Sequence, residues 1–331
     1  MASPVCLKLS MNNNSTVFSR EPEQILHGIP VFSKDIYWGK IPESELQHII
    51  EDIEQKGFDS VTPVVQKKID FTFDEDRADW RFFMDLPKET VVLDVGAGLG
   101  RISIPLARTF KHVIACDQSL SRMRFLKQRA AHEGLDNITV FVGDIYDLPL
   151  KEHSVDLIVM NGVLEWVGLT DLYKDPRVAQ VKSLEICHRL LKKGGYVYVG
   201  IENRFAAAYL RAADHGGLRF TNFMPRPVAN WYSKLVIGMP YRTYTYTKRG
   251  YEKLFLEAGF ARQPQTYILY PGYNLPRVII PYGDVGVYRY AATAFKQQRG
   301  IRRAALLLIR LPLFVRISNF FAYSFGLMAR K

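Results

Sequence analysis

The sequence predicts an α/β fold built on one open, mostly parallel sheet. Five apolar segments with strand character follow one another between residues 91 and 203, and helix-length stretches separate most of them. The expected strands cover 91–96, 112–117, 138–144, 155–163 and 196–203. Because strands joined by such stretches form right-handed crossovers, we expect these five to lie parallel in a single sheet.

The segments between the strands have helical character. Helices are expected at 101–110, 120–134 and 175–195, the last of which has Pro176 near its start and a Gly-Gly pair at its end. The strand VDLIVMNGV (155–163) is nearly all apolar, as expected for a strand buried on both faces.

The sequence pattern divides the chain into three parts. Residues 1–87 form a leader and a helical extension, in which apolar residues recur at helical spacing. Residues 88–283 carry the strand–helix alternation, with an insertion at 204–246 after the fifth strand and two β-like runs near 264–282. Residues 284–331 form a basic, helical tail.

The positive charge of the chain is concentrated in the tail. Of the net charge of +11, nine charges lie in residues 285–331, which contain no Asp or Glu, so +2 remains for all other residues. A nearly neutral body makes nucleic acid the less favoured partner. Within 296–331, the cations of the first part fall on one side of an amphipathic helix, which is typical of binding to an anionic membrane surface. Packing of this helix on the body is the alternative.

Three widely spaced cysteines form neither a disulfide framework nor a zinc pattern and suit a reducing compartment. The first residues lack the apolar core of a secretory signal. No uncharged apolar run approaches the length of about 20 residues that spans a membrane. We therefore expect a cytoplasmic protein, peripheral on the inner face of a membrane, and leave its oligomeric state open.

A glycine-rich turn follows the first strand of the sheet. In LDVGAGLG (93–100) the glycines are Gly96, Gly98 and Gly100, and Arg101 stands where the third glycine of a dinucleotide-binding loop would be. Asp94, two residues before the first glycine, would repel a pyrophosphate but suits a ligand with an ammonium group. S-adenosyl-L-methionine (SAM) is such a ligand.

The next strand ends carry further polar groups. The second strand ends in Asp117, whose carboxylate can accept hydrogen bonds from both ribose hydroxyls, and the third ends in Gly143-Asp144-Ile145, where an acid can bind the adenine amino group. Because parallel strands end at one edge of the sheet, these groups are expected to form one crevice.

With LDVGAGLG, ACDQS, GDI, NGVLEWV and LLKKGGYVYVGIEN in this order, the chain resembles the class I SAM-dependent methyltransferases. The resemblance covers 90–203 and, more loosely, continues to 282. It implies a Rossmann-like, seven-stranded sheet whose last strand is antiparallel and supplied by the runs near 264–282, with SAM as cofactor. The expected cofactor-binding residues are Asp94, Gly96, Gly98, Gly100, Asp117, Gln118, Gly143, Asp144, Ile145, Asn161 and Gly162.

Two residues are candidate catalytic groups. Glu165, in NGVLEWV, could take a proton from the acceptor or bind a cation, although it could equally cap the next helix. His215, before two glycines in the insertion, is a second candidate base. No metal site is predicted. Base-N methylation is disfavoured because the Asp/Asn-Pro-Pro-aromatic turn is absent, and carbon-5 pyrimidine methylation because no cysteine is suitably placed.

The acceptor is expected to bind the insertion, which mixes cationic and aromatic side chains suited to sugars and phosphates. These are His215, Arg219, Arg226, Arg242, Tyr244 and Tyr246. DRADW, IENRF, DHGGLRF and YRTYTYTKRGYEKLFLEAGF resemble a subgroup associated with bacterial surface-polysaccharide and glycolipid assembly. We therefore expect methylation of a sugar-containing or lipid-linked acceptor. The alternatives are an RNA methyltransferase that uses the basic tail, and a non-catalytic partner-binding module with a SAM-binding fold.

Overall fold

A computed structural model of the chain describes residues 17–39, 41–69, 72–287, 290 and 312–331. Its strands are β1 (Gln24–Leu26), β2 (Ile29–Val31), β3 (Val91–Val95), β4 (His112–Asp117), β5 (Ile138–Val142), β6 (Val155–Asn161), β7 (Leu191–Glu202), β8 (Gln265–Tyr270), β9 (Val278–Pro281) and β10 (Ser324–Arg330). They form one ten-stranded sheet in the order β1-β2-β5-β4-β3-β6-β7-β10-β8-β9.

The sheet confirms the predicted α/β class. Strands β5, β4, β3, β6 and β7 are parallel neighbours, and they correspond to the five strands expected between residues 91 and 203. Ten strands are present where seven were expected, because the β1–β2 hairpin extends one edge of the sheet and β9 extends the other.

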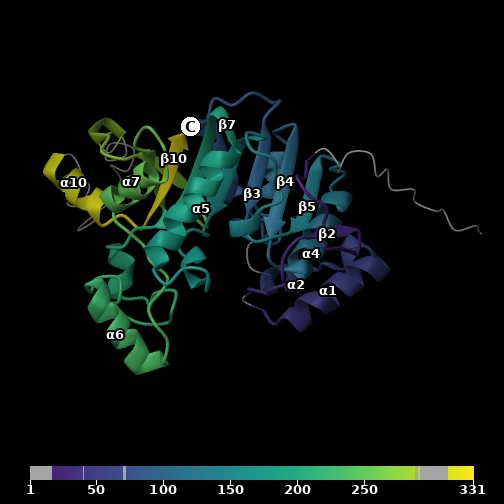
Figure 1. The fold of residues 1–331 in the computed structure, drawn as a ribbon, viewed down its shortest axis with the longest axis horizontal. Coiled ribbons are helices and arrows are strands. Elements are labelled where there is room, and N and C mark those ends of the chain that lie inside the picture. Colours follow the sequence, from purple (N-terminus) through teal and green to yellow (C-terminus); the bar gives the residue numbers. More distant parts are fainter. Residues whose placement is uncertain (1–16, 40, 70–71, 288–289, 291–311) are drawn as a thin grey trace, which may run out of the picture.

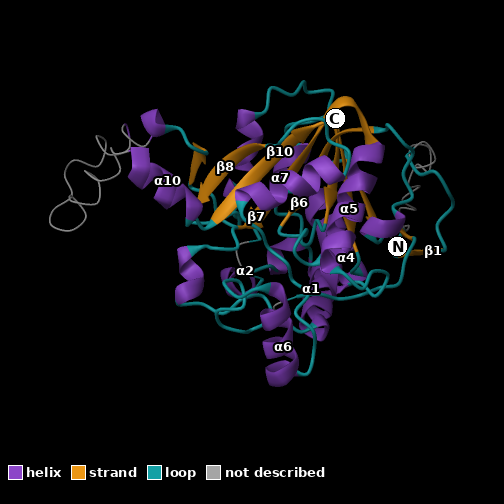
Figure 2. Ribbon diagram, turned by 60° about the vertical axis from the view of Figure 1, so that its left-hand side comes forward, coloured by secondary structure: helices purple, strands orange, loops and turns teal. Residues whose placement is uncertain are grey.

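Helices cover both faces of the sheet (Figures 1 and 2). The α-helices are α1 (Glu43–Lys56), α2 (Pro63–Lys68), α3 (Ser103–Ala107), α4 (Leu120–His132), α5 (Pro176–Leu190), α6 (Arg226–Ile237), α7 (Lys248–Glu257) and α10 (Pro312–Phe320). Short 3₁₀ helices are η2 (Phe58–Ser60), η3 (Asp76–Phe83), η4 (Ile145–Asp147), η5 (Val167–Leu169) and η6 (Ala207–Leu210).

Alternation along β3 illustrates how the core forms on both faces. Leu93 and Val95 pack in the cluster that contains apolar residues of α5 and α7. Val92, between them, points to the opposite face and packs in the cluster that contains residues of η3 and α3. This follows from the period of two in a strand, and it explains why both faces of these strands are mostly apolar.

The N-terminal extension contains the helix that the sequence predicts. The apolar face of α1, formed by Leu46, Ile49, Ile50 and Ile53, packs in one buried cluster with Phe125 of α4. The extension ends in the 3₁₀ helix η3, shortly before β3. The extension therefore packs against the outer side of α4.

The antiparallel strand comes from a different segment than expected. Strand β10, from the C-terminal tail, lies between β7 and β8 and is antiparallel to both. The expectation that the runs near 264–282 supply the strand next to β7 is wrong, because they form β8 and β9 farther out. The end of the tail is thus a strand of the central sheet, and its residues 325–329 are buried.

The structure describes α10 of the tail and α6 of the insertion, but not the residues between 290 and 312. The basic amphipathic helix expected within 296–311 lies outside the described residues, while α10 begins at Pro312. The segment predicted to be an insertion after β7 contains α6, which projects from the body in Figures 1 and 2. None of the helices in the described part of the chain is long and apolar enough to cross a membrane.

The burial of β10 leads to a stability prediction. Leu327 is fully buried between β7 and β8, whereas Leu313, in the same tail, is 69% exposed. Leu327→Ala should lower the free energy of unfolding by about 3 kcal/mol because it leaves a cavity, and Leu313→Ala should change it by less than about 0.5 kcal/mol. Urea unfolding measures both; equal effects would show that β10 is not part of the core.

Candidate cofactor-binding and catalytic site

The glycine loop after β3 makes a tight turn at the carboxyl edge of the sheet. The backbone N–H groups of Gly96 and Ala97 both donate to the carbonyl of Cys116 on β4, at 2.8 and 2.9 Å. Gly96 has a φ of +71°, and a Cβ there would come within 2.6 Å of the Val163 side chain. Glycine is therefore required for the loop to fit between β4 and the segment after β6.

Gly100 lies where the loop packs closely on α4. Its φ is +84°, and a Cβ would collide with the side chain of Leu126 on α4. Gly96 and Gly98 line the cavity described below, but Gly100 does not. The role predicted for Gly100 in cofactor binding stays a prediction; the structure shows the close packing of the loop on α4 at this position.

Asp94 lies beneath the loop. It is 2% exposed, accepts a hydrogen bond from the Ser103 hydroxyl at 2.6 Å and does not line the cavity. Burial raises the pKa of Asp94 to about 7, and the bond from Ser103 lowers it only in part. Its predicted part in cofactor binding stays a prediction, and the position favours support of the loop over direct contact.

Asp117, at the end of β4, connects the loop to α4. One carboxylate oxygen accepts from the Gly98 N–H at 3.0 Å and lies 3.4 Å from the Arg122 guanidinium. The other oxygen accepts from the Ser119 N–H at 3.0 Å. The carboxylate faces the cavity, where it is placed to accept hydrogen bonds from a diol.

The end of β5 forms the adjoining wall. Gln118 donates to Asp144 at 2.7 Å, which links the end of β4 to the turn after β5. Asp144 caps η4 by accepting from the Tyr146 N–H at 2.9 Å. Both side chains line the cavity together with Gly143 and Ile145, so the structure brings these four predicted residues together.

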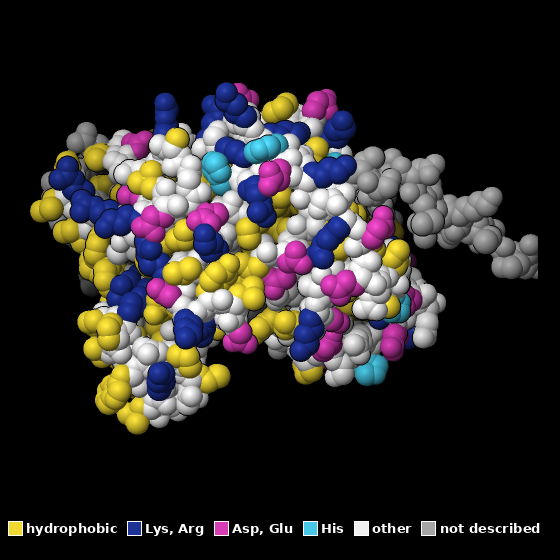
Figure 3. Space-filling model, in the orientation of Figure 1, with side chains coloured by type: hydrophobic (Ala, Val, Ile, Leu, Met, Phe, Trp, Pro, Cys, Tyr) yellow, Lys and Arg dark blue, Asp and Glu magenta, His cyan; other side chains and the backbone are white. Residues whose placement is uncertain are grey.

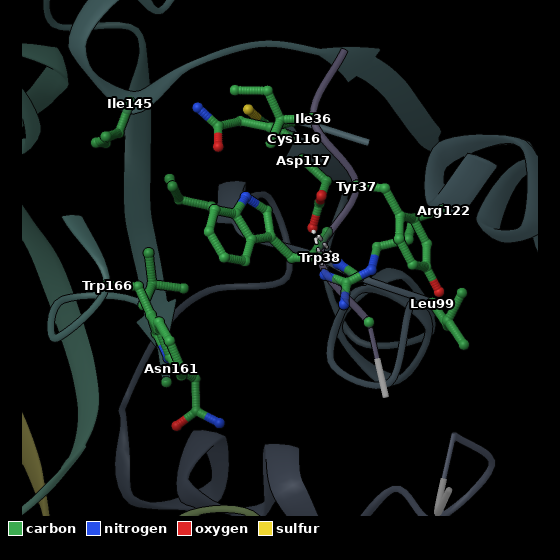
Figure 4. A pocket seen from close by; sticks show the side chains of 18 of the residues that line it. Ile36, Tyr37, Trp38, Leu99, Cys116, Asp117, Arg122, Ile145, Asn161 and Trp166 are labelled. Carbon is green, nitrogen blue, oxygen red and sulfur yellow. Dashed lines mark hydrogen bonds and ion pairs between the residues drawn. The ribbon is translucent and has the colours of Figure 1, made fainter. Parts of the chain in front are cut away.

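A cavity of about 900 Å³ lies over these strand ends, large enough for a nucleoside-sized ligand. The N-terminal extension covers it with Ile36, Tyr37 and Trp38. In Figure 4, Trp38 lies between the Ile145 side of the cavity and the side formed by Asp117 and Arg122. The ring centres of Trp38 and Trp166 are 6.4 Å apart. The sequence pointed to none of these covering residues.

Asn161 and Gly162 line the cavity at the end of β6, as predicted. Arg77 of η3 donates to the Asn161 carbonyl at 2.8 Å. Gly162 has a φ of +72°, and a Cβ there would meet the Tyr273 ring at 2.6 Å. Arg77, which itself lines the cavity, and Tyr273, which does not, therefore fix this wall; neither residue was singled out from the sequence.

The two predicted catalytic residues lie in one cluster with a third residue; the two carboxylates are buried and His215 is partly exposed. His215 Nε2 is 3.2 Å from Glu202 Oε2 and 3.9 Å from Glu165 Oε1, and Tyr273 donates to Glu165 at 3.4 Å. Glu165 is fully buried and Glu202 is 3% exposed. Trp166, which lines the cavity, contacts His215 with ring centres 4.8 Å apart. The cluster thus lies behind the Trp166 wall.

Burial and charge both act on the protonation of this cluster. Burial raises the pKa of Glu165 to about 8, and the charge of Glu202 adds to this effect. Burial alone lowers the pKa of His215, but contact with the two carboxylates outweighs it and raises the pKa to about 9. Glu202 was missed from the sequence, although its position at a strand end, in IEN, was a usable signal.

Two of the three arginines expected to bind the acceptor, Arg226 and Arg242, have partners inside the protein. Arg242 donates to the carbonyls of Gly168, Thr170 and Tyr173, and its guanidinium fixes the loop after η5. Arg226 donates to a backbone carbonyl, and its guanidinium lies 4.1 Å from the centre of the Tyr244 ring. Neither arginine lines the cavity, so a role in phosphate binding stays a prediction.

Comparison with known proteins finds a methyltransferase domain in the part of the chain that carries the parallel strands. The family described as a methyltransferase domain matches residues 93–199. The chain is 32% identical to the malonyl-[acyl-carrier protein] O-methyltransferase of Methylococcus capsulatus, over 38% of this chain and 42% of that protein. It is also 32% identical to phosphoethanolamine N-methyltransferase 1 of Caenorhabditis elegans, over 38% of this chain and 24% of that protein. The chain thus spans less than half the length of these relatives.

A solved SAM-dependent methyltransferase from Aquifex aeolicus is similar over 88% of this chain and 99% of that chain, with 15% identity and a TM-score of 0.45. Residues 93–199 thus match the methyltransferase domain family, and the mostly parallel sheet is that of the class I SAM-dependent methyltransferase fold, whose cofactor is SAM.

The position of Asp117 leads to a binding prediction. Asp117→Asn removes the charge that attracts hydroxyl donors and should weaken SAM binding by about tenfold or more. Asp136→Asn, at an exposed position after α4, is the matched control and should bind as the unmodified protein does. Isothermal titration with SAM and S-adenosylhomocysteine measures both; equal affinities in the two variants would contradict the assignment.

The buried Asp94 carboxyl leads to a prediction about pH. Burial raises its pKa from 3.8 to about 7, so between these values the folded protein holds a proton that the unfolded chain has released. This contribution to stability is therefore lost as the pH rises. Asp94→Asn removes it, so the Tm of the variant relative to the unmodified protein should increase from about pH 5 to about pH 8. Differential scanning fluorimetry without ligand, with Asp136→Asn as control, measures this; a constant difference would refute it.

Proposed function

We propose that this protein transfers the methyl group of SAM to a sugar-containing or lipid-linked acceptor that is presented at an anionic membrane surface. The proposal takes its reaction from the methyltransferase domain and its acceptor class from the insertion. The observation that carries the acceptor class is the apolar and basic surface of α6, which is joined to the cofactor cavity through Arg242.

The reaction needs an aligned acceptor and a destination for one proton. For a hydroxyl acceptor, oxygen attacks the methyl carbon, the carbon–sulfur bond breaks and its electron pair stays on sulfur, which gives S-adenosylhomocysteine. The acceptor proton must then leave. Glu165 and His215 are proposed to accept this proton, because they lie directly behind Trp166 at the cavity wall. Trp38 and Trp166 are proposed to align the acceptor and to exclude water, and this supplies the rest of the rate acceleration.

The surface of α6 has the composition of a membrane-binding element. Six large apolar side chains in and after α6 are at least 40% exposed, and these are Val228, Trp231, Leu235, Val236, Ile237 and Met239. Residues 215–251 contain six Lys or Arg and no Asp or Glu. Figure 3 shows this projecting end of the molecule with hydrophobic and basic side chains together. Exposed apolar side chains beside cations and without acids favour an anionic lipid surface.

The same insertion is bonded to the cofactor cavity. Arg242, shortly after α6, donates at 2.7 Å to the carbonyl of Thr170, and Leu169, Thr170 and Asp171 line the cavity. In Figure 1, α6 lies at the lower left and α1 and α2 at the lower right, so all three are on the lower side of the molecule; the segment before α1 covers the cavity. An acceptor held in a membrane beneath α6 would therefore be near the cavity, which suits a lipid-linked substrate.

Label transfer from SAM tests the reaction and the acceptor class. Incubation of the purified protein with methyl-labelled SAM and fractionated bacterial extract should place the label in the lipid-soluble or polysaccharide fraction. Label only in RNA would favour the RNA methyltransferase and overturn the proposed acceptor. SAM binding without label in any fraction would favour the non-catalytic module.

Substitutions on α6 test the membrane surface. Trp231→Glu with Leu235→Glu should lower binding to phosphatidylglycerol-rich vesicles by about tenfold or more, because burial of two large apolar side chains is lost. Leu256→Glu, at an exposed apolar position on α7, is the matched control. SAM affinity should stay unchanged in both. Unchanged co-sedimentation of the α6 variant, or no binding of the unmodified protein to these vesicles, would refute the proposed surface.

Residues 296–331 are also proposed to bind an anionic membrane surface. Co-sedimentation with the same vesicles measures this binding. Arg299, Arg302 and Arg303 are replaced by Gln for this purpose. Truncation of 296–331 is unsuitable because it removes β10 from the sheet.

A further inference from the structure

The side chains of Glu165, Glu202 and His215 come from three separate segments and converge behind the cavity wall. Glu165 follows β6, Glu202 ends β7, and His215 lies in the insertion. Their possible ligand atoms all lie within 4.8 Å of one another. We propose that Glu165, Glu202 and His215 form a binding site for a divalent transition-metal cation. This site is an addition to the proposed reaction and does not depend on which acceptor is methylated.

The donor set is of the right type and nearly at the right spacing. Two carboxylates and one imidazole suit first-row divalent metals better than calcium, which prefers oxygen alone. With metal–ligand distances of about 2.1 Å, neighbouring ligand atoms lie about 3 Å apart. The separations of 3.2 and 3.9 Å from His215 Nε2 are close to this, so small side-chain movements would complete the coordination.

Burial supplies the second, independent observation. The Glu165 side chain is fully buried, and its Oε2 has no hydrogen-bond partner among the described residues. A buried carboxylate oxygen without a partner is costly, and such groups usually bind an ion or ordered water. The second oxygen, Oε1, accepts from the Tyr273 hydroxyl at 3.4 Å and lies 3.9 Å from His215 Nε2.

The charge of the cluster points in the same direction. With a neutral imidazole the two carboxylates carry two negative charges, and a protein interior tolerates such a pair only when it is neutralised. Two protons, or one divalent cation, achieve this. Arg77 neutralises the carboxylates only from a distance. Its guanidinium donates to the Asn161 carbonyl and lies 5.5 Å from the centre of the Tyr273 ring. A cation behind Trp166 would favour the ionised form of a nearby acceptor oxygen.

Metal binding to the full-length protein tests the site. After treatment with EDTA and dialysis, the protein should bind about one Mn²⁺ per chain by electron paramagnetic resonance, and Mn²⁺ should raise its Tm. Glu202→Gln and His215→Gln should each weaken Mn²⁺ binding by about tenfold or more, since even changes outside the ligand shell commonly cost this much. Zn²⁺ and Mg²⁺ are compared in the same titration.

Controls separate this proposal from the proposed function. Glu257→Gln, at an exposed position on α7, should bind Mn²⁺ as the unmodified protein does. SAM affinity of the Glu202 and His215 variants shows whether they are folded. No Mn²⁺, Zn²⁺ or Mg²⁺ binding by the unmodified protein, or equal binding by folded variants, would overturn the metal site and leave the methyl transfer untouched. Mn²⁺ binding without SAM binding would overturn the proposed function instead.

Discussion

The carboxylate of Asp117 organises the cofactor site. It accepts hydrogen bonds from the Gly98 and Ser119 N–H groups and lies beside Arg122, so one side chain joins the glycine loop to the start of α4. This junction forms at the carboxyl edge of the sheet, near the point where the chain crosses from one side of β3 to the other. Open α/β sheets bind their ligands at such a point, and the cavity lies there because neighbouring strands diverge into loops on opposite sides.

The parts of the site that could be predicted are those that depend on short segments. Asp117, Asp144 and Gly162 follow directly on strands, and parallel strands end at one edge, so spacing was enough to bring them together. Gly100 shows the limit of this reasoning, because its glycine is required by Leu126, 26 residues later in the sequence. The contact between Glu202 and His215 depends on how the insertion packs against the end of β7. No local sequence pattern predicts this packing.

Strand β10 could not be predicted for a related reason. SFGLMAR has no strict alternation and follows a long basic segment, and its partners in β7 begin more than 120 residues earlier. The segment before β10 also contacts the end of β7, where Glu202 lies. Asn203, next to Glu202, donates to the carbonyls of Phe320 and Ala322, at 2.7 and 2.9 Å. The tail therefore fixes the end of β7, and with it one carboxylate of the buried cluster.

The charge of that cluster bears on the chemistry beside it. SAM carries a positive charge on sulfur that disappears when the methyl group leaves, so a strongly negative neighbour would stabilise the reactant more than the transition state. Two unneutralised carboxylates behind Trp166 would act in this way. Neutralisation by protons or by a cation removes the penalty, and it leaves polar groups that can orient an acceptor. The burial of Glu165 and Glu202 is thus compatible with methyl transfer only if the cluster is compensated, which is the common requirement behind the proposed catalytic and metal-binding roles.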